Sequence, residues 1–207
     1  AVLGLEVQAE NGVQMKSAAK QTHERNSEMM KYSKFAAMIA TSTVVMFGLM
    51  YLNTYAWDHV YFSETRAYMA LVMGAAMAVV MLGFMWGMYR SRTVKLLVIA
   101  GAFAMGGVFL YLVRSQDTVG DEAWMKAMIP HHSIAVLTSA RAEISDPRVR
   151  KLADRVIETQ VREIEEMKLL LADIEANGEQ ADGQPLPARS TRLTPEMEAQ
   201  ARQAVEP

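Results

Sequence analysis

The sequence has no cysteine in its 207 residues. This absence excludes disulfide bonds, thiolate metal sites and cysteine nucleophiles. The sequence also shows no nucleophile beside a base, no phosphate-binding loop and no pair of catalytic carboxylates, so we expect the protein not to be an enzyme. The formal net charge is only -2, and no basic stripe carries interleaved aromatic residues. We therefore expect no nucleic-acid partner.

Charge is missing from three long stretches, residues 35–57, 67–89 and 96–113. Each stretch is long enough to cross a hydrocarbon core of roughly 30 Å at about 1.5 Å per helical residue. Three buried soluble helices in succession would leave almost no amphipathic surface to face water. We therefore predict an all-α membrane protein in which residues 35–113 form three transmembrane helices within a lipid bilayer.

The loop Arg90–Lys95 carries three positive charges and no negative one. The positive-inside rule places such a loop in the cytoplasm. Residues 1–34 are then also cytoplasmic, and everything after Val113 lies on the other side of the membrane. Residues 1–11 lack the basic start and short apolar run of a cleavable signal, so we expect the first membrane helix to act as the insertion signal.

After the last apolar stretch, residues 114–176 are expected to form a helical hairpin in water. The first helix is predicted from Asp121 to Ile144, with a kink near Pro130 because proline removes a backbone donor. The second helix is predicted over residues 147–176, with Asp146 as its N-cap and a proline at its first position.

The remaining residues, 177–207, are polar and contain Pro185 and Pro187, which predicts a flexible tail. At the start of this segment, a glycine at position 178 is expected to stop the second hairpin helix. Further along, Thr194 is placed to cap a short helix that ends near Val205.

A two-helix hairpin of this size does not enclose a core of its own. We therefore expect a homo-oligomer, with a four-helix bundle from two hairpins as its simplest form. The surface to be buried is the apolar stripe of the second helix, namely Val149, Leu152, Ala153, Val156, Ile157, Ile164, Met167 and Leu171.

Residues 125–132 combine two methionines with two of the four histidines. On a helix Met125, Met128 and His132 share one face, and His131 lies beside it. Methionine sulfur favours Cu(I), and imidazole accepts copper, nickel or zinc, whereas Mg²⁺ and Ca²⁺ prefer oxygen ligands. These four residues are therefore the predicted metal ligands, with copper as the metal. In the alternative interpretation, the methionines fill a core and the histidines are hydrogen-bonded at the kink.

Three residues of the second hairpin helix are predicted to surround this site: Gln160, Glu163 and Met167. Gln160 falls within the apolar stripe and Glu163 on its border. A buried polar group without a partner costs about 1–3 kcal/mol. In an antiparallel hairpin that turns near Asp146, these side chains face the methionines and histidines of the first helix.

The connection between the first two membrane helices, residues 53–65, contains Asp58 next to His59. Tyrosine and tryptophan in the same segment are typical of a membrane interface. We consider two interpretations of the pair. It is either a metal-entry or proton-handling site, or it consists of ordinary solvated loop residues.

The second membrane helix carries methionine every fourth residue and then the third. Such a row is either adaptable packing at a helix interface or a thioether ladder for Cu(I). Its MxxxM spacing resembles that in the second membrane helix of eukaryotic copper transporters. The row consists of Met69, Met73, Met77, Met81, Met85 and Met88.

Several short motifs resemble the bacterial domain of unknown function 305. They are Met128-Ile129-Pro130-His131-His132, Ala135, Asp146-Pro147-Arg148-Val149, Leu152-Ala153, Gln160, Glu163-Ile164 and Met167. The span 34–175 is similar to the membrane-anchored branch of that family, including Asp58-His59 and the extension His131-His132-Ser133-Ile134-Ala135. Soluble relatives usually place a methionine at the position of Thr138 and a tryptophan at that of Leu170.

The resemblance implies a ferritin-like helical bundle, an extracytoplasmic location and, for some relatives, copper binding and copper tolerance. Together with the residue patterns, it predicts a bacterial inner-membrane protein that binds copper on its periplasmic side. Its role would be homeostasis, storage or hand-off to copper-handling proteins. Two alternatives stay open: an oligomeric scaffold without metal, and Cu(I) transport along the methionine row.

Overall fold

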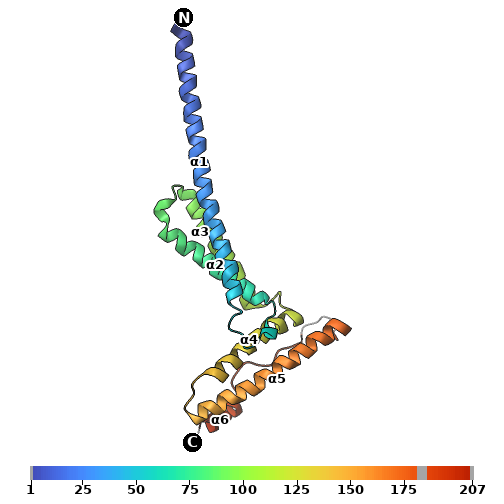
Figure 1. Cartoon of the computed structure of the whole chain (residues 1–207). Helices are drawn as coiled ribbons and strands as arrows, with labels where there is room; N and C mark the ends of the chain where they lie inside the picture. The colour runs from blue at the N-terminus through green and yellow to red at the C-terminus, as the bar shows by residue number, and fades with distance from the viewer. Residues whose placement is uncertain (1, 181–185, 206–207) are drawn as a thin grey trace. The chain divides into compact units, whose positions relative to one another are not determined.

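The computed structural model describes residues 2–180 and 186–205, and every regular element in these ranges is helical. The segments 181–185 and 206–207 of the expected tail, and Ala1, lie outside the described residues. The elements in chain order are α1 (Val2–Leu49), η1 (Trp57–His59), α2 (Glu64–Phe84), η2 (Trp86–Met88), α3 (Arg92–Ser115), α4 (Asp121–Arg141), α5 (Pro147–Asn177) and α6 (Pro195–Gln203) (Figure 1).

The chain divides into two compact units. The three-helix unit comprises Ala1–Leu49 and Thr65–Asp117, and the hairpin unit comprises Met50–Glu64 and Thr118–Pro207. Residues 50–64, which connect α1 to α2 in sequence, therefore belong to the hairpin unit.

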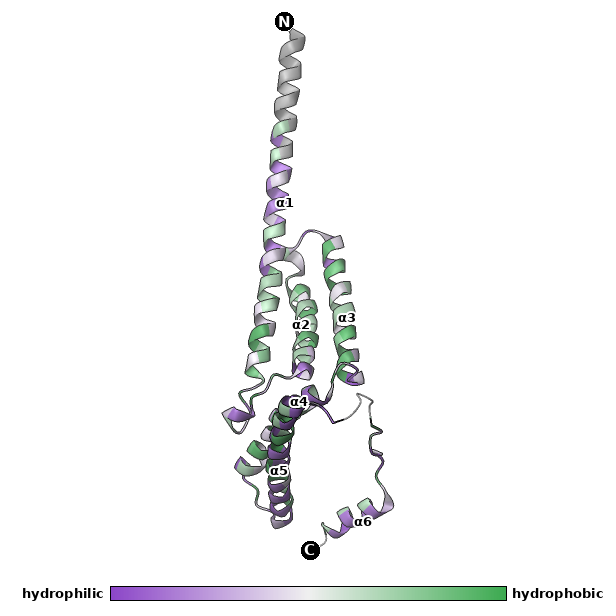
Figure 2. Ribbon diagram, turned by 90° about the vertical axis from the view of Figure 1, so that its right-hand side faces the viewer, coloured by the Kyte–Doolittle hydropathy of each residue, from purple (hydrophilic) through white to green (hydrophobic). Residues whose placement is uncertain are grey.

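Three helices of the first unit are long and apolar enough to cross a membrane: Ala19–Leu49, Glu64–Phe84 and Arg92–Ser115. This confirms the prediction of three such helices. The first one does not begin where the apolar residues begin, because α1 continues without a break from the polar N-terminal segment into the apolar one. Figure 2 shows this change from hydrophilic to hydrophobic along α1.

Small residues allow the helices of this unit to approach closely. On α2 every fourth residue is buried, namely Ala70, Gly74, Ala78 and Leu82. A Cβ atom at Gly74 would collide with the side chain of Thr43 on α1, so only glycine fits this crossing without a shift.

The methionine row is shorter than its spacing predicts. Helix α2 ends at Phe84, so Met85 lies past its end and Met88 lies in η2. The helix ends here because Gly83 and Gly87 favour a break and the chain must turn into α3. Four methionines remain on α2, namely Met69, Met73, Met77 and Met81. Each of them directly precedes one of the buried residues of α2 named above.

The turn between α2 and α3 is held by a buried cation. Lys95 is 4% exposed. Its Nζ donates to the Trp86 carbonyl at 3.0 Å and lies 4.1 Å from the centroid of the Trp86 ring. Ser91 caps α3 by accepting a hydrogen bond from the Val94 amide. The expected cytoplasmic location of this basic loop stays a prediction.

In the hairpin unit, α4 packs along α5. As expected, α4 runs through Pro130 as one helix, but it ends at Arg141, before the expected Ile144. The expected start of α5 is confirmed, because the Asp146 side chain accepts from the Arg148 amide at 2.8 Å. Its end is confirmed as well, since Gly178 with φ 80° follows Asn177.

The core of the hairpin consists of Met125, Ile129, Val136, Ile164 and Met167. The predicted stripe of α5 needs a correction at its beginning, where Val149 and Leu152 are about half exposed. The inward face instead follows a three-and-four spacing that puts these two positions on the flank. It runs through Ala153, Ile157, Gln160, Ile164, Met167, Leu171 and Ile174.

The loop 50–64 supplies part of the cover that a second hairpin was expected to give. Tyr61 packs against the hairpin core, and η1 contacts α4. The predicted cap of the last helix is confirmed, since Thr194 Oγ1 accepts from the Met197 amide at 3.3 Å. Oligomerisation stays a prediction.

Candidate functional site

His132 is the central side chain of the hairpin. It is 9% exposed, and both of its ring nitrogens have partners. Nδ1 lies 2.9 Å from the Met128 carbonyl, which belongs to the preceding turn of α4. Because a carbonyl oxygen only accepts, Nδ1 must carry a hydrogen. Nε2 then points across to α5, where it lies 2.9 Å from Glu163 Oε2.

The contact with Glu163 contains one proton, held either by the imidazole or by the carboxyl group. Gln160 donates to the same carboxyl oxygen through its Nε2 at 3.4 Å. The predicted approach of Gln160 and Glu163 to the histidine pair is thus present for His132. Chemically, an imidazole whose Nδ1–H is fixed on a carbonyl and whose Nε2 faces the opposite helix is oriented as metal-ligating histidines usually are.

His131 does not join this cluster. Its side chain is exposed, and its ring centroid lies 6.1 Å from that of His132 at an interplanar angle of 67°. Within the described ranges of the chain, the His131 side chain takes part in no hydrogen bond or ion pair. The reason is the continuity of α4, because consecutive residues of an unbroken helix point about 100° apart.

The methionine side chains belong to the apolar core of the hairpin. Met125 and Met167 are buried, and Met128 packs against them while its carbonyl holds the imidazole. The described residues contain no group of three or more histidine, aspartate or glutamate side chains that could hold a metal ion. A metal at His132 would therefore need sulfur or amide donors, or groups from another molecule, besides Glu163.

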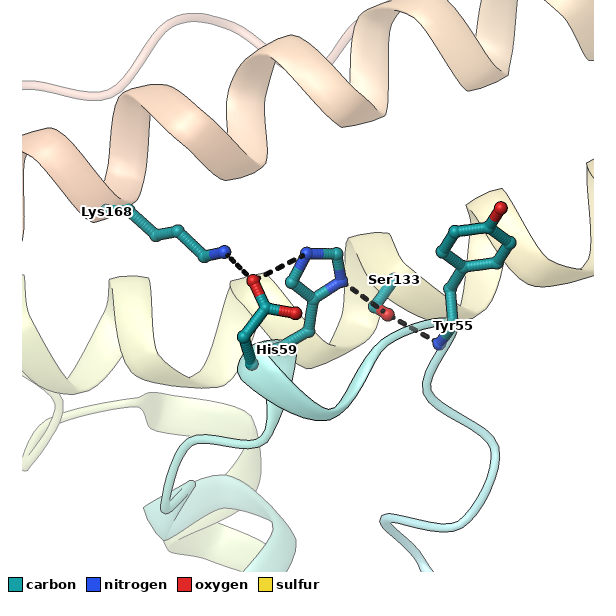
Figure 3. A network of polar contacts seen from close by, with 5 residues as sticks. Tyr55, His59, Ser133 and Lys168 are labelled. Atoms are coloured by element: carbon teal, nitrogen blue, oxygen red, sulfur yellow. Dashed lines mark hydrogen bonds and ion pairs between the residues drawn. The ribbon is translucent and has the colours of Figure 1, made fainter.

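A second polar network joins the loop 50–64 to both hairpin helices, and Figure 3 shows it. Ser133, the neighbour of His132, is 0% exposed. Its Oγ accepts from the Tyr55 amide at 2.7 Å and lies 2.9 Å from His59 Nδ1. The serine oxygen has one hydrogen and two lone pairs, so it either donates to an unprotonated His59 Nδ1 or accepts from an Nδ1–H group.

The charged end of this network lies on α5. Lys168 Nζ lies 2.5 Å from Asp58 Oδ2, and the same oxygen lies 3.8 Å from His59 Nε2. The hydrogen bond from Lys168 lowers the pKa of Asp58, and burial lowers the pKa of His59 despite the nearby carboxylate. We call the set Tyr55, Asp58, His59, Ser133 and Lys168 the loop clasp.

The loop clasp contains serine, histidine and aspartate, yet it is not a nucleophilic site. A nucleophilic hydroxyl must reach a substrate atom. The Ser133 side chain is completely buried and already accepts the Tyr55 amide, so no substrate reaches it. The clasp instead fastens the loop to α4 through Ser133 and to α5 through Lys168.

Sequence reasoning singled out Asp58 and His59 but missed the roles of Ser133 and Lys168. Ser133 belonged to the His-His-Ser segment, and its small polar side chain on a helix was the available signal. Lys168 offered none, because a lysine on an amphipathic helix is usually solvated. Both contacts join residues far apart in sequence, which no local pattern predicts.

Comparison with known proteins gives one family and one relative. Residues 115–206 match the family model described as "Domain of unknown function (DUF305)". An uncharacterized protein of Acanthamoeba polyphaga mimivirus is 36% identical over 66 residues, which is 31% of this chain and 43% of that protein. The chain therefore spans less than half the length of this curated relative. No solved structure matches the chain at a significant level.

Proposed function

We propose that this chain, whose residues 115–206 match the DUF305 family model, is a membrane-anchored protein that binds copper through its hairpin unit. Its role is storage, buffering or hand-off of the metal rather than catalysis. Copper is thus the cargo of the protein. The hairpin would act in the periplasm of a bacterial cell, beyond the inner membrane.

The orientation of the His132 ring is the observation that carries this proposal. Its Nδ1 is fixed on the Met128 carbonyl, so Nε2 is presented toward the opposite helix. There Glu163 Oε2 lies 2.9 Å from Nε2, and the Gln160 amide donates to the same carboxylate oxygen. A metal ion would replace the proton between Nε2 and Oε2 after a small outward movement of Glu163.

The surrounding donors favour copper over other metals. Cu(I) prefers soft ligands, and the thioether sulfur of methionine is one of them. Met125 and Met128 lie on the same helix as His132 and pack in the adjacent core. The exposed His131 is the imidazole through which an ion would pass to or from a partner, either a second copy of the chain or a copper-handling protein.

The orientation in the membrane is proposed from the positive-inside rule. Arg90 before α3, and Arg92 and Lys95 in its first turn, favour the cytoplasm. The N-terminus is then cytoplasmic as well, and the hairpin unit lies on the periplasmic side. Fusion of a periplasm-dependent reporter after α3 would test this assignment, and activity of a cytoplasm-dependent reporter there would contradict it.

The proposal is tested by metal loading of the full chain in mild detergent. Copper is added anaerobically as Cu(I) and aerobically as Cu(II), and bound metal is measured by mass spectrometry. We expect binding by the wild type and by the control His23→Ala, whose histidine is exposed on α1. Binding should be lost in the double variant His131→Ala/His132→Ala. A folded wild type that binds no copper would refute the proposal.

One observation favours a different function, that of a structural scaffold. His132, Glu163 and Gln160 satisfy one another without a metal ion. A scaffold predicts that copper leaves the melting temperature of the hairpin unchanged. Copper binding to the native state alone predicts a rise in that temperature, by mass action. Transport along the methionine row is not proposed, because Met85 and Met88 lie outside α2.

A further inference from the structure

Pro130 makes the middle of α4 a weak point. Proline lacks a backbone N–H, so the carbonyl four residues earlier, that of Lys126, receives no helical hydrogen bond from this position. The helix nevertheless continues through this turn. His132 follows two residues later, so the imidazole stands on the part of α4 that its own backbone supports least.

The loop clasp supports this turn from outside. Ser133 directly follows His132, and its hydroxyl is held at 2.7 Å by the Tyr55 amide and at 2.9 Å by His59. Ser133 is completely buried, so water does not compete for these bonds. Rotation of this turn of α4 would break both bonds at once. The same rotation would turn the His132 ring away from Glu163.

The loop also grips the opposite helix. Asp58 pairs with Lys168, which follows Glu163 on α5 by less than two helical turns. Tyr61 packs on the core formed by residues of both helices. The loop thus fixes α4 and α5 against each other at the level where His132 meets Glu163.

We propose that the loop 50–64 is the positioning element of His132. Ser133 and His59 set the rotation of α4, and Asp58 with Lys168 sets its distance from α5. This inference rests on the proposed function, because the side chain that the loop positions is the proposed copper ligand. The loop begins at the end of α1 and ends at the start of α2 in the sequence.

The test measures the ¹⁵N chemical shifts of the histidine rings by NMR. The sample is the metal-free full chain, labelled with ¹⁵N-histidine, in detergent micelles. The ring ¹⁵N shifts report whether Nδ1 carries the hydrogen. In the wild type we expect His132 to be fixed in the Nδ1–H form. The exposed His131 is the internal reference for a ring that is free to exchange between forms.

Two variants remove the clasp at its two ends. Ser133→Ala removes the anchor on α4, and Lys168→Met removes the anchor on α5. In both we expect the His132 shifts to move toward the averaged values of His131. The matched controls are Ser139→Ala on α4 and Lys151→Met on α5, which leave the clasp intact and should keep wild-type shifts. If Ser133→Ala does not fold, Lys168→Met decides alone.

Wild-type ring shifts in both clasp variants would overturn the inference. A copper titration then separates this outcome from failure of the proposed function. If the wild type binds copper, affinity should fall in both clasp variants by about tenfold or more, as is usual when the support of a ligand is lost. If the wild type binds none, the proposed function fails, while the metal-free shifts still decide whether the loop positions His132.

Discussion

The Ser133 hydroxyl lies 2.9 Å from His59 Nδ1, a contact between residues 74 positions apart in the sequence. The Tyr55 amide donates to the same oxygen, so Ser133 Oγ joins two points of the loop 50–64 to α4. His59 is partly buried in this arrangement, and burial disfavours the charged form of its ring. Acid should therefore destabilise the folded hairpin unit.

The first prediction concerns the pH dependence of hairpin stability. Burial lowers the pKa of His59 below its usual value of 6.5. The unfolded chain therefore binds more protons at this histidine than the folded chain does, and stability must fall as pH drops below about 6.5. We expect thermal unfolding of the hairpin unit to occur at lower temperature at pH 5.5 than at pH 7.5.

In His59→Gln this part of the pH dependence should disappear, whereas the control His23→Gln should keep it. The acid loss due to Asp58 is separate, because the pKa of that carboxyl is lowered from 3.8 and its effect begins only below that value. An unchanged pH profile in His59→Gln would show that His59 is not the titrating group.

The second prediction concerns Glu163. Replacement by leucine leaves Nε2 of the buried His132 without its partner, which should cost about 1–3 kcal/mol in the free energy of unfolding. Glu163→Gln should cost less, because the amide can donate to a neutral Nε2. Urea unfolding followed by circular dichroism measures both. Equal losses in the two variants would mean that shape, and not the hydrogen bond, matters at this position.

The third prediction concerns the crossing of α1 and α2. Gly74→Ala should destabilise the three-helix unit by about 1–3 kcal/mol, because the added Cβ meets the Thr43 side chain. Thr43 cannot turn aside freely, since its Oγ1 donates to the Ile39 carbonyl at 2.9 Å. The second change Thr43→Ala should restore most of the loss.

A double-mutant cycle in mixed detergent micelles measures this coupling. Gly101→Ala is the control, because nothing lies within 4 Å of a Cβ atom there. Additive effects of Gly74→Ala and Thr43→Ala would contradict the close contact.

The fourth prediction separates two residues that share the predicted stripe of α5. Met167 is 5% exposed, and Met167→Ala should cost about 2–5 kcal/mol. Leu152 is 53% exposed, and Leu152→Ala should cost less than about 1 kcal/mol. Chemical unfolding of the full chain measures both. Similar losses would indicate that a second copy covers the outer face of α5 in solution.

Sequence patterns predicted the structure wherever residues of a single helix determine it. Runs without charge predicted the three apolar helices, and Asp146 and Gly178 marked the ends of α5. The spacing of Gln160 and Glu163 from the turn also predicted their approach to His132. In each case local chemistry or a simple antiparallel register determines the structure.

Prediction failed where a contact joins distant segments or where two local preferences compete. The sequence placed both histidines in the site, but only one face of α4 packs on α5, which leaves His131 exposed. Methionine spacing continued past Phe84, although the helix did not. The anchoring of Asp58 on Lys168 depends on the tertiary fold alone.

The length of α1 has a consequence of its own. Its 48 residues form one uninterrupted rod, of which the polar part before Phe35 measures roughly 50 Å at 1.5 Å per residue. A molecule that bound the polar part would lie at a distance from the apolar part that the number of intervening residues sets. Any lengthening or shortening of the polar part would also rotate its recognised face by about 100° per residue, so both reach and direction are set by the residue count.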